Sequence, residues 1–589
     1  MKNTRIAILI LISLCLTNCS KKKSDPARPN IIVILTDDQG WGDLSFNGNT
    51  NLNTPNIDSL GLNGVSFDNF FVQPVCSPTR AELLTGIYHS KLGVYSTSEG
   101  GERMRLGVPT IAEIFKKNGY TTAAYGKWHN GMQPPYHPNS RGFDDYYGFC
   151  SGHWGNYFDP LLEHNGKIVK GEGFLPDNLF SKAIDFVNHN KENPFFLYIP
   201  VNTPHSPMQV PDEYWKKFES KELKMKHHNE EIEDENFSRA ALSMVENVDW
   251  NVGRLMNSLK DLELDSNTIV VFLSDNGPNS NRWNGGLKGK KGSTDEGGVK
   301  TSFFMQWPGK IQKGIRISEI AGAIDLLPTL TNLAQLPDDG LIIDGNDLSS
   351  LVLGSGGFVE PRTIFNHWNG KTSLRTQNYR LDNENRLFDM NNDLGQHVDI
   401  SNDNKFLVDS LIEIRRAWEA QSLISEATKN PEPFTLGYKN ATFTQIPARD
   451  GTPYGNIIRS NRWPNDSFFT NWTKTTDSIT WPIKVLSAGI YKVEMYYTCK
   501  AEHVGSQVQL NWGNQKLSTI IKDAHDPPLK GMEHDKSPRI ESYVKDFIPI
   551  VMGEIELTEG TNLLTLTSPN IINGQTIDFR LLQFEKLNP

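Results

Sequence analysis

The sequence predicts an α/β protein: a mixed, mostly parallel sheet sandwiched by helices, with a small C-terminal subdomain sheet and a β-sandwich appendage. Short apolar runs alternate with helical patterns along the first half of the chain, which is typical of parallel strands buried on both faces. After about residue 437, short alternating segments rich in Thr, Tyr, Val and Trp replace the helical periodicity. A chain of 589 residues also exceeds what one hydrophobic core supports, so several domains are expected.

Four apolar runs are the expected strands of the parallel sheet. They lie at 30–35 (NIIVIL), 120–125, 194–201 and 268–273 (TIVVFL). Between the first two runs, Thr110 and Glu113 form a capping-box pattern and Gly119 follows as a stop, which predicts a helix. A long amphipathic helix containing Leu242 and Leu259 precedes the fourth run.

The change of texture along the chain predicts the domain boundaries. The main α/β domain is expected at 29–345, the smaller subdomain at 346–430 and the β-sandwich at 431–589. Four tryptophans of the sandwich have two interpretations, as faces on which sugars stack or as parts of the core and the domain interface. They are Trp463, Trp472, Trp481 and Trp512.

The N-terminus is expected to be a processed export signal. Lys2 and Arg5 precede an apolar run too short to span a bilayer, and the run ends in Leu-Thr-Asn-Cys19. This segment resembles the lipobox of bacterial lipoproteins, which implies a signal peptide at 1–18, a lipid on Cys19 and a tether at 19–28. The protein is then expected in the bacterial cell envelope, held at the membrane by lipid alone. The alternative is an ordinary secretory signal with incidental cysteines.

The net charge and the cysteine content exclude some classes of function and structure. The formal net charge is −10, which excludes a general basic surface for nucleic acid. An anionic substrate therefore needs a local cluster of cations. Five cysteines, two of them in the signal region, form no disulfide framework for a protein of this size, which favours a chemical role for Cys76.

Cys76 is expected at the start of a helix. Pro78 suits an early helical position and Gly86 suits the C-terminal stop. The positive end of the helix dipole and the nearby Arg80 would stabilise a negative charge there, on a thiolate or on a bound oxyanion.

Polar side chains follow the carboxyl ends of the expected strands, where open α/β sheets bind ligands. They are Asp37, Asp38, Lys127, His129, His205, Asp275 and Asn276. The acids and the amide offer oxygen donors suited to Ca²⁺ or Mg²⁺. Together with Arg80 and the lysines Lys288, Lys290 and Lys291, the remaining side chains predict a cage for a tetrahedral oxyanion.

Several motifs now show a family resemblance. They are CSPTR at 76–80 with LTG at 84–86, the acids Asp37-Asp38, GKWH at 126–129, Pro204-His205, SDNG at 274–277 and KGSTDEGG at 291–298. In this order they are similar to the motifs of type I, formylglycine-dependent sulfatases, which are arylsulfatase-like members of the alkaline phosphatase superfamily. The resemblance covers about residues 29 to 400.

The resemblance implies the chemistry. Cys76 would be converted to formylglycine by a maturation enzyme that reads residues 77–86. One hydroxyl of the aldehyde hydrate would then attack sulfur and release the sugar alcohol, which leaves a sulfate ester on residue 76. The second hydroxyl would then lose its proton and expel sulfate. One Ca²⁺ is expected, Mg²⁺ being the lesser candidate.

The resemblance also implies a role for each site residue at the position that matches a family motif. The implied metal ligands are Asp37, Asp38, Asp275 and Asn276 with residue 76. Arg80 and Lys127 would hold the hydrate, His129 would assist its deprotonation, and Lys291 and His205 would contact the sulfate, His205 as proton donor to the leaving oxygen.

The expected substrate is a sulfated carbohydrate. His153, Trp154 and Lys288 are candidates for substrate contacts, with core packing or a solvated loop as the alternative. Two other functions remain open: a phosphoester or phosphonate hydrolase of the same superfamily, and a non-catalytic glycan-binding lipoprotein.

Overall fold

The computed structural model describes residues 28–337, 340–356, 361–423 and 432–587. The expected signal segment, Cys19 and the tether up to residue 27 lie outside these ranges. Within them, no helix has both the length and the apolar character needed to cross a bilayer.

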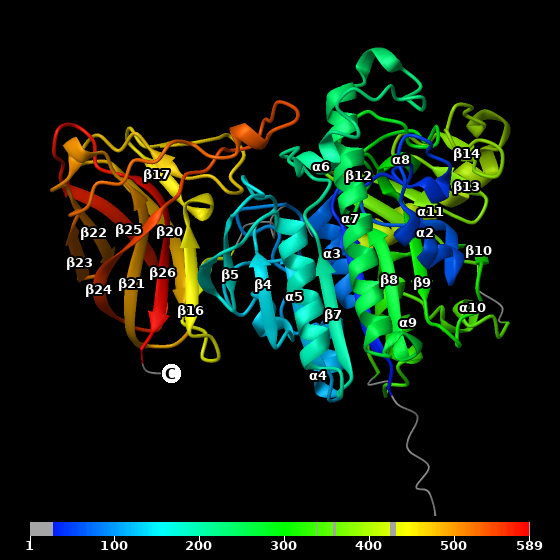
Figure 1. Cartoon of the computed structure of the whole chain (residues 1–589), viewed down its shortest axis with the longest axis horizontal. Helices are drawn as coiled ribbons and strands as arrows, with labels where there is room; N and C mark the ends of the chain where they lie inside the picture. The colour runs from blue at the N-terminus through cyan, green and yellow to red at the C-terminus, as the bar shows by residue number, and fades with distance from the viewer. Residues whose placement is uncertain (1–27, 338–339, 357–360, 424–431, 588–589) are drawn as a thin grey trace, which may run out of the picture.

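A ten-stranded mixed sheet forms the centre of the main domain, in the order β10-β2-β9-β8-β1-β7-β3-β4-β5-β6 (Figure 1). Its strands are β1 (Asn30–Thr36), β2 (Val65–Phe71), β3 (Thr121–Lys127), β4 (Asp145–Phe149), β5 (Leu161–His164), β6 (Lys167–Lys170), β7 (Phe195–Pro200), β8 (Thr268–Ser274), β9 (Lys300–Gln306) and β10 (Ile315–Gly322). The run from β8 through β1, β7 and β3 to β4 is parallel, while β9, β5 and β6 pair antiparallel with their neighbours. The four apolar runs predicted as strands are β1, β3, β7 and β8, next to one another in the sheet.

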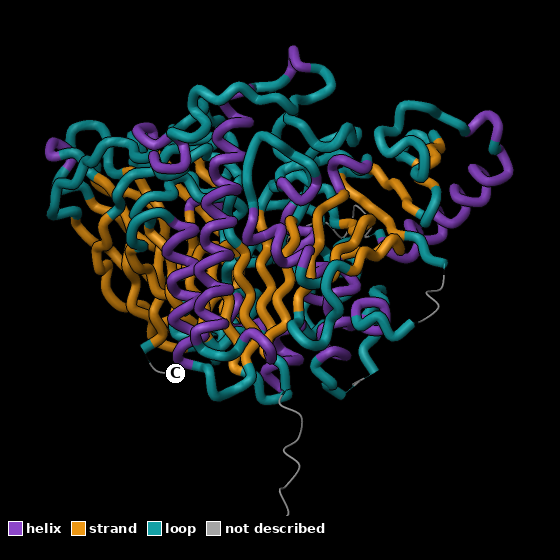
Figure 2. Tube along the Cα trace, turned by 45° about the vertical axis from the view of Figure 1, so that its right-hand side comes forward, coloured by secondary structure: helices purple, strands orange, loops and turns teal. Residues whose placement is uncertain are grey.

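Helices cover both faces of this sheet, which explains why its central strands are apolar throughout. Ile31, Val33 and Leu35 of β1 face one core, while Ile32 and Ile34 face the other. The first core is covered by α3 (Cys76–Thr85), α4 (Ile111–Lys117), α9 (Leu326–Leu333) and α10 (Ser349–Val352). The second is covered by α2 (Pro55–Leu62), α5 (Leu175–His189), α6 (Asp212–Trp215) and α7 (Glu235–Asp261), and Figure 2 shows long helices of this layer against the strands.

Local sequence signals set the helix boundaries. Thr110 Oγ1 accepts a hydrogen bond from the Glu113 backbone N–H and the Glu113 carboxylate accepts one from the Thr110 backbone N–H, so the capping box predicted for α4 is confirmed. The expected start of α3 at Cys76 is also confirmed, and Gly86 closes this helix at φ 70°. The short α8 (Glu296–Val299) leads into β9.

A small antiparallel sheet follows the main domain. It contains β11 (Ile364–Trp368), β12 (Lys371–Arg375), β13 (Tyr379–Leu381) and β14 (Leu387–Asp389), and α11 (Lys405–Ser422) packs against it. Buried Arg380 of β13 pairs with buried Glu296 of α8 at 2.8 Å, which joins this sheet to the main domain. The predicted subdomain sheet is confirmed.

Two sheets enclosing a common core form the C-terminal sandwich, as predicted (Figure 1). The first contains β15 (Phe434–Leu436), β17 (Thr452–Tyr454), β20 (Ser478–Val485), β22 (Gln507–Trp512), β23 (Gln515–Ile520) and β25 (Gly560–Asn570). The second contains β16 (Phe443–Pro447), β18 (Ile458–Arg459), β19 (Phe469–Thr470), β21 (Gly489–Thr498), β24 (Ile548–Leu557) and β26 (Asp578–Lys586). Trp472, Trp481 and Trp512 lie in its core, whereas Trp463 is 45% exposed beside Arg462.

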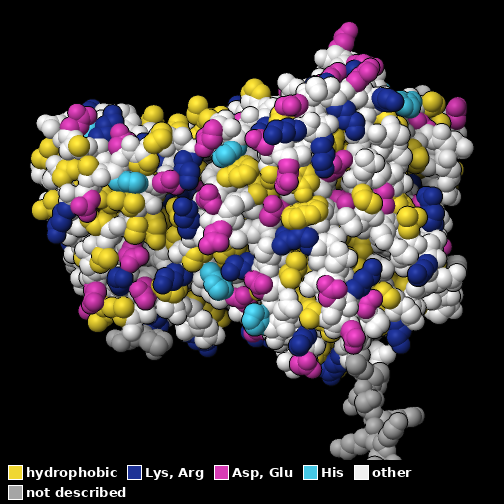
Figure 3. Space-filling view, viewed as in Figure 1, with side chains coloured by type: hydrophobic (Ala, Val, Ile, Leu, Met, Phe, Trp, Pro, Cys, Tyr) yellow, Lys and Arg dark blue, Asp and Glu magenta, His cyan; other side chains and the backbone are white. Residues whose placement is uncertain are grey.

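The charged side chains of the face in Figure 3 are interspersed, Lys and Arg alternating with Asp and Glu. A mixed face of this kind generates no strong field of one sign.

Gly126, next to the end of β3, offers a test of how closely the strands approach at the site. Its φ is 138°, and a Cβ atom there would lie 2.0 Å from the Pro200 carbonyl oxygen on β7. We expect Gly126→Ala to lower the free energy of unfolding by about 2 kcal/mol, because both the backbone and the neighbouring strand are strained. Denaturant unfolding measures it. Gly489→Ala, whose nearest neighbour would be 3.5 Å away, is the control, and equal effects would contradict the argument.

Candidate active site

Three carboxylates and an amide meet at the carboxyl ends of β1 and β8. The two strands are parallel and pair Thr36 with Ser274, so the residues that follow them emerge side by side. Asp38 N donates to Asp275 Oδ1 at 3.2 Å, and Asn276 Nδ2 donates to Asp38 Oδ1 at 2.8 Å. The four side chains, Asp37, Asp38, Asp275 and Asn276, are fully buried.

Each acid has its own cation from another element. Arg80 Nη2 of α3 lies 2.7 Å from Asp275 Oδ2, and Lys127 Nζ at the end of β3 lies 2.6 Å from Asp37 Oδ2. Lys291, from the loop before α8, lies 2.7 Å from Asp38 Oδ1. Because three positive groups oppose three negative ones, the protein part of the site is close to neutral.

Burial and neighbouring charges shift the pKa values of Asp38 and Asp275 in opposite directions. Burial alone would raise the pKa of Asp38, but the charges of Lys291, His205 and Lys127 and the hydrogen bond from Asn276 together outweigh it, and the pKa is lowered. The pKa of Asp275 is raised to about 6, first by burial and then by the charge of Asp37. Repulsion between adjacent carboxylates is the condition that a bound cation relieves.

Cys76 lies at the N-terminus of α3, directly over this cluster. Its Sγ and single oxygens of Asp37 and Asp275 all lie within 4.8 Å of one another. The thiol pKa is raised because burial and the two acids outweigh Lys127 and Lys291. A helix terminus and an arginine are therefore insufficient here to make Cys76 an acidic thiol, so the thiolate alternative lacks support.

The helix that carries Cys76 is held by two contacts. Thr79 Oγ1 donates to the Asp275 carbonyl at 2.6 Å, which fixes the first turn of α3 to the end of β8. Asn130 Nδ2 donates to the Ser77 carbonyl at 3.1 Å. Sequence reasoning missed Asn130, although it directly follows the GKWH motif.

His205 lies on the loop after β7 at the rim of the cluster. It is 8% exposed, its Nε2 is 3.6 Å from Asp38 Oδ2, and its Nδ1 is 2.5 Å from the Ser206 carbonyl. Burial and then Lys291 lower the pKa of His205 to about 4. Tyr157 Oη donates to the carbonyls of His205 and Ser206, both at 3.0 Å, which anchors the loop.

His129 is buried just after β3 in a left-handed conformation, with φ 65°. Its Nε2 lies 2.8 Å from the Thr97 carbonyl, while Nδ1 contacts no hydrogen-bond partner in the part of the chain that the structure describes. Burial and then Lys127 lower its pKa well below the usual value. His129 is thus a neutral imidazole beside Lys127.

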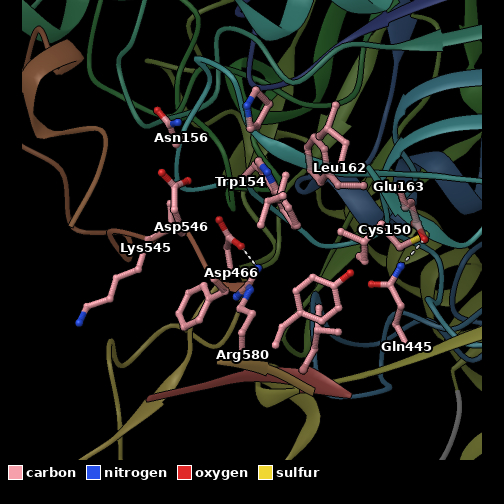
Figure 4. Close-up of a pocket in the computed structure, with 18 of the residues that line it drawn as sticks. Cys150, Trp154, Asn156, Leu162, Glu163, Gln445, Asp466, Lys545, Asp546 and Arg580 are labelled. Carbon is pink, nitrogen blue, oxygen red and sulfur yellow. Dashed lines mark hydrogen bonds and ion pairs between the residues drawn. The ribbon is translucent and has the colours of Figure 1, made fainter. Parts of the chain in front are cut away.

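The three candidate substrate residues lie in three different places. The ring of His153 stacks with that of His205 at 6.1 Å, so it belongs to the rim. Trp154 stacks on Phe149 and lies under the Arg580 guanidinium, which places it in the interface with the sandwich (Figure 4). Lys288 pairs with Asp295 at 3.3 Å and lies over Phe388 of the small sheet.

The cluster fits a hard divalent cation. Asp37 Oδ1 and Asn276 Oδ1 are buried oxygens without a hydrogen-bond partner among the described residues. Buried polar atoms are almost always paired, so two unpaired oxygens in an acidic cluster indicate a missing positive partner. Oxygen-only donors of this kind suit Ca²⁺ or Mg²⁺ better than a soft metal.

Comparison with known proteins agrees with this geometry. The profile of the family described as Sulfatase matches residues 29–336. This chain belongs to the sulfatase family. As a sulfatase it is a sulfuric ester hydrolase, and the resemblance seen in the motifs is confirmed.

Two named sulfatases and one solved structure are similar to this sulfatase. N-acetylgalactosamine-6-sulfatase of Mus musculus is 32% identical over 387 residues, covering 59% of this chain and 70% of that protein. Arylsulfatase A of Homo sapiens is 33% identical over 368 residues, covering 56% of this chain and 68% of that protein. The crystal structure of Ps i-CgsB in complex with k-i-k-neocarrahexaose is similar with a TM-score of 0.60 and 34% identity, covering 67% of this chain and 93% of that one.

The ion pair between Arg80 and Asp275 is the most deeply buried contact of the sulfatase site and can be tested by stability. We expect Arg80→Met to lower the free energy of unfolding by about 3 kcal/mol or more, because it leaves buried carboxylates without their cation. Denaturant unfolding in the presence of a chelator measures the change.

Arg316→Met is the matched control. Arg316 pairs with Asp68 at 2.5 Å, but its side chain is 69% exposed. An exposed pair of this kind contributes less than about 1 kcal/mol. Equal losses in the two variants would contradict the electrostatic account of the site.

Proposed function

We propose that this sulfatase removes sulfate from a sulfated carbohydrate, using residue 76 as formylglycine and one Ca²⁺. The observation that carries the proposal is the convergence of Cys76, Asp37 and Asp275 within 4.8 Å at a helix N-terminus, with cations around them. The Ps i-CgsB complex contains k-i-k-neocarrahexaose and N-acetylgalactosamine-6-sulfatase is named for a sulfated sugar, which supports a carbohydrate substrate.

Asp37, Asp38, Asp275 and Asn276 would hold the Ca²⁺. When bound, it supplies positive charge that favours deprotonation of a neighbouring hydroxyl and attracts sulfate oxygens. Mg²⁺ is the lesser candidate, because Mg²⁺ retains water and is seldom held by a site made of protein groups alone.

Formylglycine at position 76 would supply the nucleophilic hydroxyl through its hydrate. A maturation enzyme that reads residues 77–86 is the implied partner. Arg80 and Lys127 would hold and charge-stabilise this residue, and this role is supported by their ion pairs with acids that adjoin Cys76. His129 would take a proton from the hydrate, a role supported by its Nδ1, which has no hydrogen-bond partner among the described residues.

Lys291 and His205 act on the substrate side. In the free protein His205 directs Nδ1 at the Ser206 carbonyl, which leaves Nε2 facing the site. The charge of a bound sulfate ester raises the pKa of the imidazole, so that Nε2 takes up a proton from solvent. That proton is then delivered to the leaving sugar oxygen while the Lys291 ammonium binds a sulfate oxygen.

We also propose that the protein is exported in a bacterial cell and anchored by a lipid on Cys19. The lipobox-like segment supports this, and polysaccharide degradation at the envelope would suit such an anchor.

Removal of the nucleophile tests the proposed function. We expect Cys76→Ala to lose at least about 1000-fold in sulfate release from sulfated oligosaccharides, because no nucleophile remains at position 76. Ion chromatography of released sulfate measures it on wild type and variant. Unchanged thermal unfolding is the control for folding.

Two outcomes would overturn the proposal. A wild-type preference for nitrophenyl phosphate over nitrophenyl sulfate would indicate a phosphoester hydrolase. An unmodified thiol in the Cys76 peptide, measured by mass spectrometry after expression with a competent maturation enzyme, would favour a non-catalytic glycan-binding protein.

The metal is tested independently of activity. We expect wild type to bind one Ca²⁺ and Asp275→Asn to bind it at least about 100-fold more weakly, because one of three anionic ligands is lost. Isothermal titration after chelation measures the affinity. Asp68→Asn, a partly exposed surface acid, should bind like wild type; equal binding by Asp275→Asn would exclude this metal site.

A further inference from the structure

A long connection of the sandwich lies against the His205 loop. Residues 521–547 join β23 to β24 and contain only a short helical turn at Met532–His534. Connections longer than about 15 residues are uncommon in a compact domain, and they are usually either functional or linker segments. Figure 1 shows this connection, in orange, extending from the sandwich toward α6 of the main domain.

The segment just after His205 makes polar contacts with this connection. Gln209 Nε2 donates to the Gly531 carbonyl at 2.7 Å, and Lys536 N donates to the Met208 carbonyl at 2.9 Å. Lys536 Nζ also lies 2.8 Å from Asp212 of α6. The connection therefore runs alongside the loop that carries His205.

Glu541 of the connection contacts the residue that directly follows His205. Ser206 Oγ donates a hydrogen bond to Glu541 Oε1. The Ser206 carbonyl in turn faces His205 Nδ1 at 2.5 Å. One chain of contacts thus leads from the sandwich to the imidazole, whose Nε2 faces Asp38.

The base of the connection is firmly held. The Arg539 side chain is fully buried, donates to the Gly155 carbonyl at 2.5 Å and pairs with Asp535. Gly155 N donates to Asp466 of the sandwich, which also pairs with Arg580 (Figure 4).

Buried polar contacts also join the two domains elsewhere. Arg449 of the sandwich pairs with Glu102 at 2.6 Å, and Gln445 Nε2 donates to Glu163 at 2.7 Å beside a cavity of about 50 Å³ (Figure 4). Buried pairs of this kind are costly to separate. The sandwich is therefore docked in one position.

We propose that Glu541 of the 521–547 connection is a positioning residue for His205. Glu541 holds Ser206, and the Ser206 carbonyl orients the imidazole through Nδ1, so that Nε2 is directed at the leaving oxygen. The inference rests on the proposed role of His205 as proton donor. It makes the sandwich part of the catalytic machinery instead of a separate sugar-binding module.

The test uses two leaving groups, because a proton donor matters most for a poor one. In the full-length protein we expect Glu541→Ala to lower kcat for a sulfated sugar at least about 10-fold, with KM within about 2-fold. Nitrophenyl sulfate, whose leaving oxygen needs no proton, should change by less than about 3-fold. Glu541→Gln keeps an acceptor for Ser206 Oγ and should retain most of the activity.

The controls separate positioning from folding. Glu556→Ala removes an exposed glutamate from β24 of the same domain and should leave both rates unchanged. Ser206→Ala cuts the same link from the other side and should reproduce the leaving-group dependence, even if Glu541→Ala proves unstable.

Two results would overturn the inference while leaving the sulfatase function intact. They are equal losses on both esters, which would indicate a structural role, and unchanged rates in Glu541→Ala and Ser206→Ala. A mature wild type that releases sulfate from neither ester would remove the proposed function itself.

Discussion

The neutralisation of three buried carboxylates is the constraint on which the rest of the site depends. An ion buried without a partner costs several kcal/mol, so Asp37, Asp38 and Asp275 require cations at hydrogen-bond distance. Arg80, Lys127 and Lys291 come from three different segments, and meeting this requirement brings α3, the end of β3 and the loop before α8 together. Because these pairs already balance, a divalent cation would make the site positive, which is what an anionic ester needs.

The same constraint explains the state of Cys76. Burial and the neighbouring carboxylates disfavour the thiolate form of Cys76. The pKa of this thiol is therefore raised, although Cys76 begins a helix. The site is thus poorly arranged for thiolate chemistry and well arranged for an oxygen group that shares a cation with the acids. The helix terminus was expected to stabilise either a thiolate or a bound oxyanion. Burial disfavours the thiolate, so the bound oxyanion is the alternative that the structure supports.

The sequence was most informative where the determinants are local. A continuous apolar run reveals β1, a capping box reveals α4, and residues directly after parallel strands must emerge at one edge. It could not show which cation pairs with which acid, or that Trp154 contacts Arg580 more than 400 positions later, because such contacts depend on how whole domains dock. The link from Glu541 to Ser206 has the same origin, and the length of the 521–547 connection was the one signal that could have indicated it.

The burial of α3 has a consequence for timing. All ten residues of this helix are buried, including most of the segment that a maturation enzyme would have to read. A maturation enzyme therefore has no access to this segment in the folded protein. Under the proposed conversion, Cys76 must be oxidised on the nascent or unfolded chain, before folding closes over it. A chain that folds before this conversion keeps Cys76 as a thiol. It is then permanently inactive, although its active site is correctly assembled.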